Sequence, residues 1–187
     1  MAVLAGMDFF TIEALGRRGL RTHYILFLIQ LETRRVTLAG MTQHPVEEWM
    51  LQMARDLTDL DSGALNRQRY VLHDRDTKFC VSFRTTLAQS GVQPLMLPAR
   101  SSNLNAFAER WVRSVKEECL SKLILFGEGS LRRALTEFVE HYHSERNHQG
   151  KGNVVLFPTN PQPLDSEGSV ECRQRLGGLL KHYARAA

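Results

Sequence analysis

The segment NLNAFAERWVRSVKEECL, residues 103–120, repeats apolar side chains at the spacing of an amphipathic helix. We predict a helix over about residues 105–124. Its core-facing stripe is predicted to contain Leu104, Ala108, Trp111, Val112, Val115 and Cys119. Glu109 lies off this stripe and shares another face with Asn105, Arg113 and Lys116. The helix therefore presents an acidic side chain, with cations beside it, outside the predicted core.

Two further carboxylates stand in apolar surroundings upstream of this helix. Asp8 lies within the strand-like run of residues 4–10, and Asp74 ends another such run at residues 69–74. A buried carboxylate is costly unless it is paired, hydrogen-bonded or bound to a cation. Hard divalent cations choose oxygen ligands. Asp8, Asp74 and Glu109 together therefore indicate a metal site.

The segments around these carboxylates alternate between strand and helix patterns. Strands are predicted over residues 3–14, 22–31, 36–42, 70–74 and 92–97, and helices over residues 45–57, 82–89 and from Ser130, as N-cap, to Tyr142. Turns of hairpin length join the first three strands, so these are predicted to be antiparallel. Pro94 cannot donate a ladder hydrogen bond, which places the last strand at a sheet edge. The predicted fold class is α/β, with a five-stranded mixed sheet flanked by helices.

The composition is that of an ordinary globular protein. Of the 187 residues, 43% are hydrophobic and 24% are charged. A net charge of +4 and a pI of about 9.2 permit a nucleic-acid partner without requiring one. The three cysteines have no zinc-site spacing, which favours reduced thiols and a cytoplasmic location. The longest apolar run, residues 24–29, is too short to span a bilayer, so no membrane partner is predicted.

Four motifs, taken together, resemble a known family. Residues 103–120 look like the catalytic helix of the retroviral-type integrase core and, more narrowly, of bacterial insertion-sequence transposases of the DDE type. Met7-Asp8-Phe9-Phe10 resembles the first acidic motif of that family, and residues 73–79 resemble the second. Residues 142–150 are similar to the segment that closes the family's core. The resemblance covers about residues 3–158, with 34 residues between Asp74 and Glu109, close to the family's usual interval.

This resemblance implies a ribonuclease H-like fold and a DNA strand-transfer reaction. It places an integrase catalytic core at residues 1–158 and a C-terminal extension at residues 159–187. Two Mg²⁺ or Mn²⁺ ions would be held by Asp8, which bridges both, and by Asp74 and Glu109, which each hold one. A water or a 3′-hydroxyl would attack a phosphodiester at the element ends, and no covalent protein–DNA intermediate would form.

The resemblance also implies DNA as the partner, both as element ends and as target DNA. Arg113 and Lys116 match basic positions that contact the donor DNA end in relatives, and Arg110 and Asn105 are predicted as further DNA contacts. Because two ends must be joined together, a homo-oligomer is expected. A cytoplasmic bacterial protein, associated with the nucleoid when bound to DNA, is the corresponding location.

Several of these assignments have structural alternatives. Asp76 competes with Asp74 as the second ligand, although Asp74 fits the strand end and the spacing better. Arg113 is also placed to form an i,i+4 pair with Glu109. His73 is predicted to pack locally rather than to transfer a proton, and Trp111 to lie in the core rather than to stack on a base.

Two other functions compete with strand transfer. Relatives usually carry a helix-turn-helix region before the first strand, and this sequence begins directly at that strand. The alternative is therefore an inactive, truncated or domesticated fragment that acts only as a DNA-binding protein. A ribonuclease acting on RNA–DNA hybrids is favoured by fold alone, which does not determine function. The helix around Glu109 argues against that ribonuclease.

Overall fold

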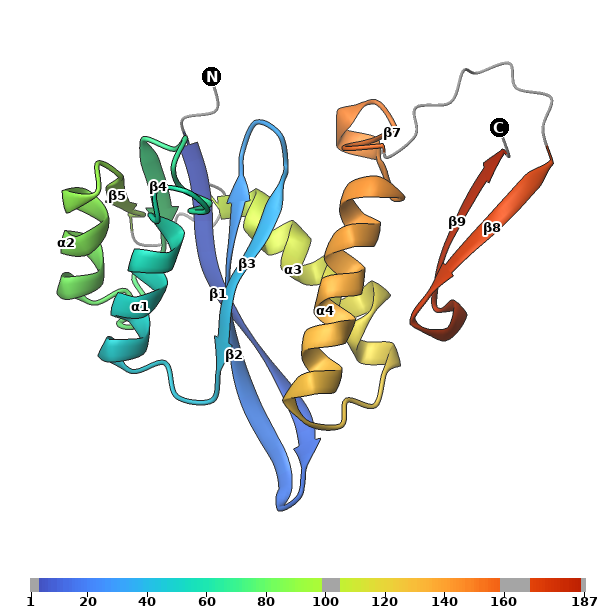
Figure 1. The fold of residues 1–187 in the computed structure, drawn as a ribbon, viewed down its shortest axis with the longest axis horizontal. Coiled ribbons are helices and arrows are strands. Elements are labelled where there is room, and N and C mark those ends of the chain that lie inside the picture. The colour runs from blue at the N-terminus through green and yellow to red at the C-terminus, as the bar shows by residue number, and fades with distance from the viewer. Residues whose placement is uncertain (1–3, 99–104, 159–168, 186–187) are drawn as a thin grey trace. The chain divides into compact units, whose positions relative to one another are not determined.

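The computed structural model describes residues 4–98, 105–158 and 169–185. The chain forms two compact units, residues 1–113 and residues 114–187. Figure 1 shows the fold as a ribbon. The first unit contains the sheet and the beginning of the predicted catalytic helix, and the second contains a long helix and a C-terminal hairpin. The two units are described in turn.

A five-stranded mixed sheet forms the centre of the first unit, as predicted. Its strands, in chain order, are β1 (Leu4–Gly16), β2 (Gly19–Gln30), β3 (Val36–Thr42), β4 (Tyr70–His73) and β5 (Gln93–Met96). Their spatial order is β3-β2-β1-β4-β5, with β1, β2 and β3 antiparallel and with β4 and β5 parallel to β1. Pro94 lies on β5, at the sheet edge where its missing N–H is tolerated.

The register of the two central strands brings two of the predicted ligands to the same level of the sheet. β4 pairs in parallel with β1 from Leu4↔Tyr70 to Gly6↔Leu72 and ends at His73. Continuing that register by two places sets Asp74 opposite Asp8. Because β4 ends at His73, Asp8 has no partner in the β1–β4 ladder.

Helices α1 (Glu47–Leu57) and α2 (Val81–Gln89) cover one face of this sheet. The core between them and the strands contains Ala5, Met7, Leu26, Leu28, Met50, Ala54, Phe83 and Leu87, all fully buried. Gly40 on β3 allows α1 to approach closely, because a Cβ there would lie 2.8 Å from a ring carbon of Trp49. Helix α1 begins at Glu47, two residues after the predicted start at Pro45, and ends at the predicted Leu57.

The beginning of α3 (Ala106–Glu118) packs on the opposite face of the sheet. Trp111 is completely buried, with its ring centroid 5.7 Å from that of Phe10 and 4.4 Å from that of Phe27. The prediction that Trp111 lies in the core is confirmed. Residues 99–104, which include the predicted stripe residue Leu104 and most of the predicted polar loop, lie outside the described residues.

The second unit begins within α3 and differs from the prediction at its helix ends. Helix α3 stops at Glu118 rather than near residue 124, because Cys119 leaves helical geometry at φ −128° and ψ −71°, before the 3₁₀ helix η2 (Leu120–Lys122). Helix α4 (Gly127–Ser144) starts before Ser130. The Ser130 hydroxyl instead accepts a hydrogen bond from the N–H of Phe126 at 3.2 Å, within the first turn.

The C-terminal part of the second unit contains elements that the sequence did not predict. These are β6 (Asn147–His148), η3 (Gln149–Lys151), β7 (Val154–Val155), β8 (Val170–Arg175), η4 (Leu176–Gly178) and β9 (Leu180–Arg185). Strands β8 and β9 form an antiparallel hairpin. In the part of the chain that the structure describes, no helix is long and apolar enough to cross a membrane.

Candidate active site

Asp8 lies on the central strand β1, on the sheet face that packs against α3. Each of its two carboxylate oxygens accepts one hydrogen bond. The N–H of Phe9 donates to Oδ1 at 2.7 Å, and the side-chain amide of Asn105 donates to Oδ2 at 3.2 Å. Asp8 is half-buried, so its carboxylate is held by named donors while part of it stays accessible.

The surroundings of Asp8 disfavour its negative charge. The pKa of Asp8 is raised to about 6. Burial is the largest cause, the hydrogen bond from Phe9 lowers the pKa in part, and the negative charges of Asp74, Glu109 and Asp76 contribute to the rise. The three predicted ligands therefore lie close enough for the charges of Asp74 and Glu109 to act on Asp8, and in the absence of a cation these charges repel.

Asp74 and Asp76 differ in whether a cation is paired with the carboxylate. Asp74 directly follows β4, is half-buried, and its Oδ1 accepts the N–H of Asp76 at 3.0 Å. Asp76 forms an ion pair with the Lys78 ammonium group and also accepts the N–H of Lys78 at 2.9 Å. Lys78 lies near the rings of Phe9 and Tyr24, at 5.3 and 5.4 Å from their centroids. Of the two carboxylates, Asp76 is thus the one paired with a cation.

His73 packs locally, as predicted. It is 2% exposed, and its ring lies 4.9 Å from that of Phe79. Burial lowers the pKa of His73, which favours the neutral imidazole, and its Nδ1–H donates to the carbonyl oxygen of Asp74 at 2.7 Å. His73 therefore supports the turn that follows β4.

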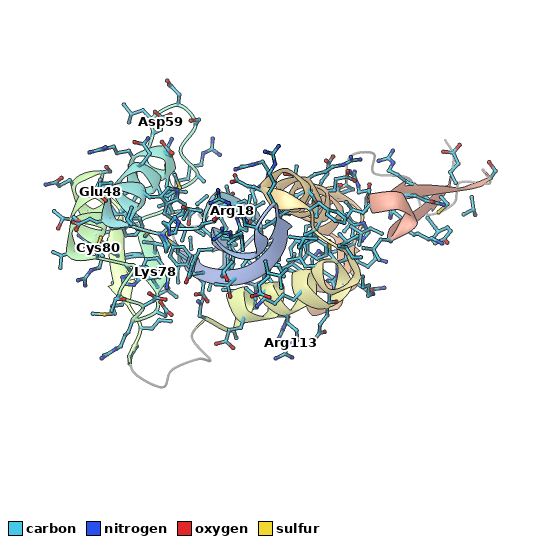
Figure 2. The ribbon with its side chains drawn as sticks, turned by 90° about the horizontal axis from the view of Figure 1, so that it is seen from below. Arg18, Glu48, Asp59, Lys78, Cys80 and Arg113 are labelled. Atoms are coloured by element: carbon cyan, nitrogen blue, oxygen red, sulfur yellow. The ribbon has the colours of Figure 1, made fainter. Side chains whose placement is uncertain are left out.

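The third predicted ligand and the predicted DNA contacts on α3 differ in their exposure to solvent. Glu109, Arg110 and Arg113 are exposed, and Figure 2 shows Arg113 projecting outward from the helix. Lys116 is half-buried two turns beyond Glu109 on the same helix. Within the described residues, Arg113 and Glu109 do not form the i,i+4 ion pair that the sequence allowed.

Asn105 is the predicted contact whose position the sequence did not anticipate. It is only 6% exposed and faces Asp8. A Cβ on Gly6 would lie 2.8 Å from Oδ1 of Asn105, so a side chain at position 6 would displace this amide. A glycine inside a strand often marks such a close approach, so Gly6 is the sequence signal from which this contact could have been found. Its role as a DNA contact stays a prediction.

The carboxylates suit a divalent metal ion by their chemistry. Asp8, Asp74 and Glu109 offer only oxygen donors, and a cation among them would relieve the repulsion that raises the pKa of Asp8. Within residues 4–98, 105–158 and 169–185, no group of three or more His, Cys, Asp or Glu side chains is arranged to hold such an ion. The donor set therefore fits the metal, whereas the side chains do not form a closed coordination site.

Comparisons with known proteins agree with the fold and with part of the predicted catalytic core. Residues 90–155 match the family model described as "Integrase core domain". This segment includes Asn105 and Glu109 and ends beyond α4. No curated protein matches the sequence.

Two solved structures of the HTLV-2 integrase catalytic core domain in complex with magnesium share this fold. The dimeric form aligns with a TM-score of 0.61 at 8% identity, covering 83% of this chain and 93% of that one. The trimeric form aligns with a TM-score of 0.60 at 9% identity, covering 82% and 93%. At such identities the likeness concerns the fold, and the predicted ribonuclease H-like class is confirmed.

Proposed function

The chain has the fold of a retroviral-type integrase catalytic core and residues 90–155 match the integrase core domain, and we propose from this that it is a DNA polynucleotidyl transferase. The proposed reaction is phosphodiester cleavage and transesterification at the ends of a mobile element. The observation that carries the proposal is the electrostatic convergence on Asp8, because Asp74 and Glu109, from two other elements, both raise its pKa.

Asp8, Asp74 and Glu109 are the proposed catalytic residues and would hold two Mg²⁺ or Mn²⁺ ions, with Asp8 shared by both. When bound, such ions stabilise the entering and leaving oxygens of an in-line displacement. Asp74 is preferred over Asp76 because Lys78 already neutralises Asp76. The magnesium in the HTLV-2 integrase structures supports a divalent cation on this fold.

The proposed substrate is DNA, bound along the exposed side of α3. Arg110 and Arg113 present exposed guanidinium groups one residue and four residues beyond Glu109, and Lys116 follows on the same helix. Phosphates drawn to these cations would lie near the carboxylate of Glu109. A homo-oligomer would join two ends, and the HTLV-2 core is described in dimeric and trimeric forms. In this proposal the catalytic core spans residues 1–158 and the extension residues 159–187.

Plasmid nicking with Mn²⁺ tests the proposal. We expect wild-type protein to convert supercoiled plasmid to the nicked form, and Glu109→Gln and Asp74→Asn to lower the rate at least about 100-fold, since each removes a charged ligand. Asp76→Asn is the matched control, because the Asp76 carboxylate forms an ion pair with Lys78. The nicking rate of this variant should stay within about threefold of wild type.

Circular dichroism would show that the variants are folded. A folded Glu109→Gln protein that nicks at the wild-type rate would overturn the catalytic assignment. Wild-type protein that binds DNA and does not nick it would favour the DNA-binding fragment instead. Cleavage confined to RNA–DNA hybrids, offered in parallel, would point to a ribonuclease.

A further inference from the structure

We propose that Asn105 is a positioning residue that orients the carboxylate of Asp8 relative to Glu109. The inference rests on the proposed function, since it concerns the same three carboxylates. Its starting point is the hydrogen bond of 3.2 Å from the Asn105 amide to Oδ2 of Asp8. This bond joins the start of α3 to the central strand of the sheet.

The hydrogen bonds to Asp8 determine the rotation of its carboxylate. The backbone N–H of Phe9 holds Oδ1 at 2.7 Å, and Asn105 holds Oδ2 at 3.2 Å. With one donor on each oxygen, rotation of the carboxylate breaks at least one bond. Each oxygen keeps a lone pair that these two hydrogen bonds do not use, so the carboxylate is still able to bind a cation.

The backbone of β1 is adapted to this contact. Gly6 lies two residues before Asp8 and on the same face of the strand. Any side chain at position 6 would meet Asn105, since a Cβ there would lie 2.8 Å from the amide oxygen. Asn105 is 6% exposed, so its amide is enclosed at the sheet rather than offered to solvent.

A second contact holds the same turn of α3. The guanidinium carbon of Arg34, in the turn between β2 and β3, lies 3.2 Å from the ring centroid of Phe107. Asn105 and Phe107 therefore attach the start of the helix to the sheet at two points. Glu109 follows Asn105 by four residues, one helical turn, so its position depends on both contacts.

The choice of an amide suits a metal ligand. A lysine or arginine in place of Asn105 would pair with Asp8 and compete with a cation for its charge. A neutral N–H donor fixes the orientation of the carboxylate and leaves its charge available. The nearby ammonium group of Lys78 is paired with Asp76, so it does not occupy this carboxylate.

Binding of Mn²⁺, measured by titration calorimetry without DNA, tests this role. We expect Asn105→Ala to weaken binding about tenfold, as loss of an outer-shell hydrogen bond does in other metal sites. Asn66→Ala is the matched control. The Asn66 amide donates only to the backbone carbonyls of Asp59 and Leu60, so its loss should leave the affinity for Mn²⁺ within about twofold.

Thermal unfolding in chelator would show whether the variants fold, and Asn105→Ser, which is too short to reach Asp8, replaces Asn105→Ala if that protein does not. A folded Asn105 variant with wild-type affinity for Mn²⁺ and weakened DNA binding would overturn the positioning role and leave Asn105 as a DNA contact. Wild-type protein that binds no Mn²⁺ would overturn the proposed metal site together with this inference. The first result concerns Asn105 alone, so the two failures are distinguishable.

Discussion

At the scale of single residues, the charged form of Asp8 lowers the stability of the folded protein. Its pKa rises from 3.8 to about 6, chiefly through burial and then through the neighbouring carboxylates. A carboxyl group with a raised pKa binds its proton more tightly in the folded protein. Its effect on stability therefore becomes unfavourable as the pH rises from about 4 to about 6. In the proposed function Asp8 is a metal ligand, a role that requires the charged carboxylate.

We expect Asp8→Asn to stabilise the metal-free protein at neutral pH. Above pH 6 the variant should gain up to about 3 kcal/mol in the free energy of unfolding, and at pH 4 the difference should disappear. Urea unfolding in chelator at pH 4 and pH 7.5 measures this. The exposed Asp56→Asn serves as control and should show no such gain. A less stable Asp8→Asn protein at pH 7.5 would refute the account.

At the scale of elements, a buried carboxylate attaches the β8–β9 hairpin to the end of α4. The Glu145 side chain is 1% exposed and accepts hydrogen bonds from Arg175 at 2.8 and 3.0 Å and from His141 at 2.9 Å. The Nδ1–H of His182 donates to the Glu145 carbonyl at 2.9 Å. Burial raises the pKa of Glu145, but the bonds from Arg175 and His141 outweigh it and the net pKa is lowered. The attachment of the hairpin is therefore strongest at pH values above the usual pKa of a glutamate, and it weakens as the pH falls.

Arg175→Ala should release this hairpin from α4. The change leaves a buried carboxylate without its main partner, which typically costs about 3–5 kcal/mol. Hydrogen exchange should show loss of protection in β8 and β9, with the sheet of the first unit unaffected. Arg173→Ala is the control, because Arg173 is 62% exposed in its side chain and lies 3.7 Å from the same carboxylate. Equal effects of the two substitutions would contradict the prediction.

At the scale of the whole molecule, the net charge is modest. The affinity for DNA therefore depends more on where the cations lie than on the net charge. The net charge of +4 on 187 residues attracts DNA weakly, so affinity has to come from particular cations. Some basic residues are already paired, as Arg133 is with Glu137 at 3.2 Å. Exposed Arg113 is not paired within the described residues, and such a side chain is able to replace the counterions of a phosphate.

We expect Arg113→Ala to reduce the salt dependence of DNA binding. Loss of one phosphate contact should lower the slope of log affinity against log salt concentration by about 0.9. Fluorescence anisotropy with a labelled duplex across a range of salt concentrations provides the slope. Arg133→Ala should change it little, because Glu137 already balances that charge. An unaltered slope for Arg113→Ala would exclude the contact.

Much of this protein follows from local sequence patterns. The strand at residues 36–42 was predicted with its observed ends, and the five strands followed from alternation and turn length. The edge position of the last strand followed from Pro94. These signals are local, since periodicity and hydrogen-bonding capacity belong to short segments. The helix ends at Glu118 and Gly127 were missed because they depend on the backbone at single residues. Cys119 leaves helical geometry after α3, and Phe126 is extended, at φ −98° and ψ 97°, before α4.

The contacts between distant segments required the folded chain. From the sequence, Asn105 was one of several polar residues on a helix face, and Asp76 was an alternative to Asp74. In the structure Asn105 is directed at Asp8 through the space left by Gly6, and Lys78 neutralises Asp76. The β8–β9 hairpin likewise depends on Glu145, which is 25 residues or more away from it in sequence. Sequence patterns predicted which residues carry the proposed chemistry, because side-chain type and spacing are local. Which of those residues meet is a property of packing, because it depends on distances between segments that no local pattern contains.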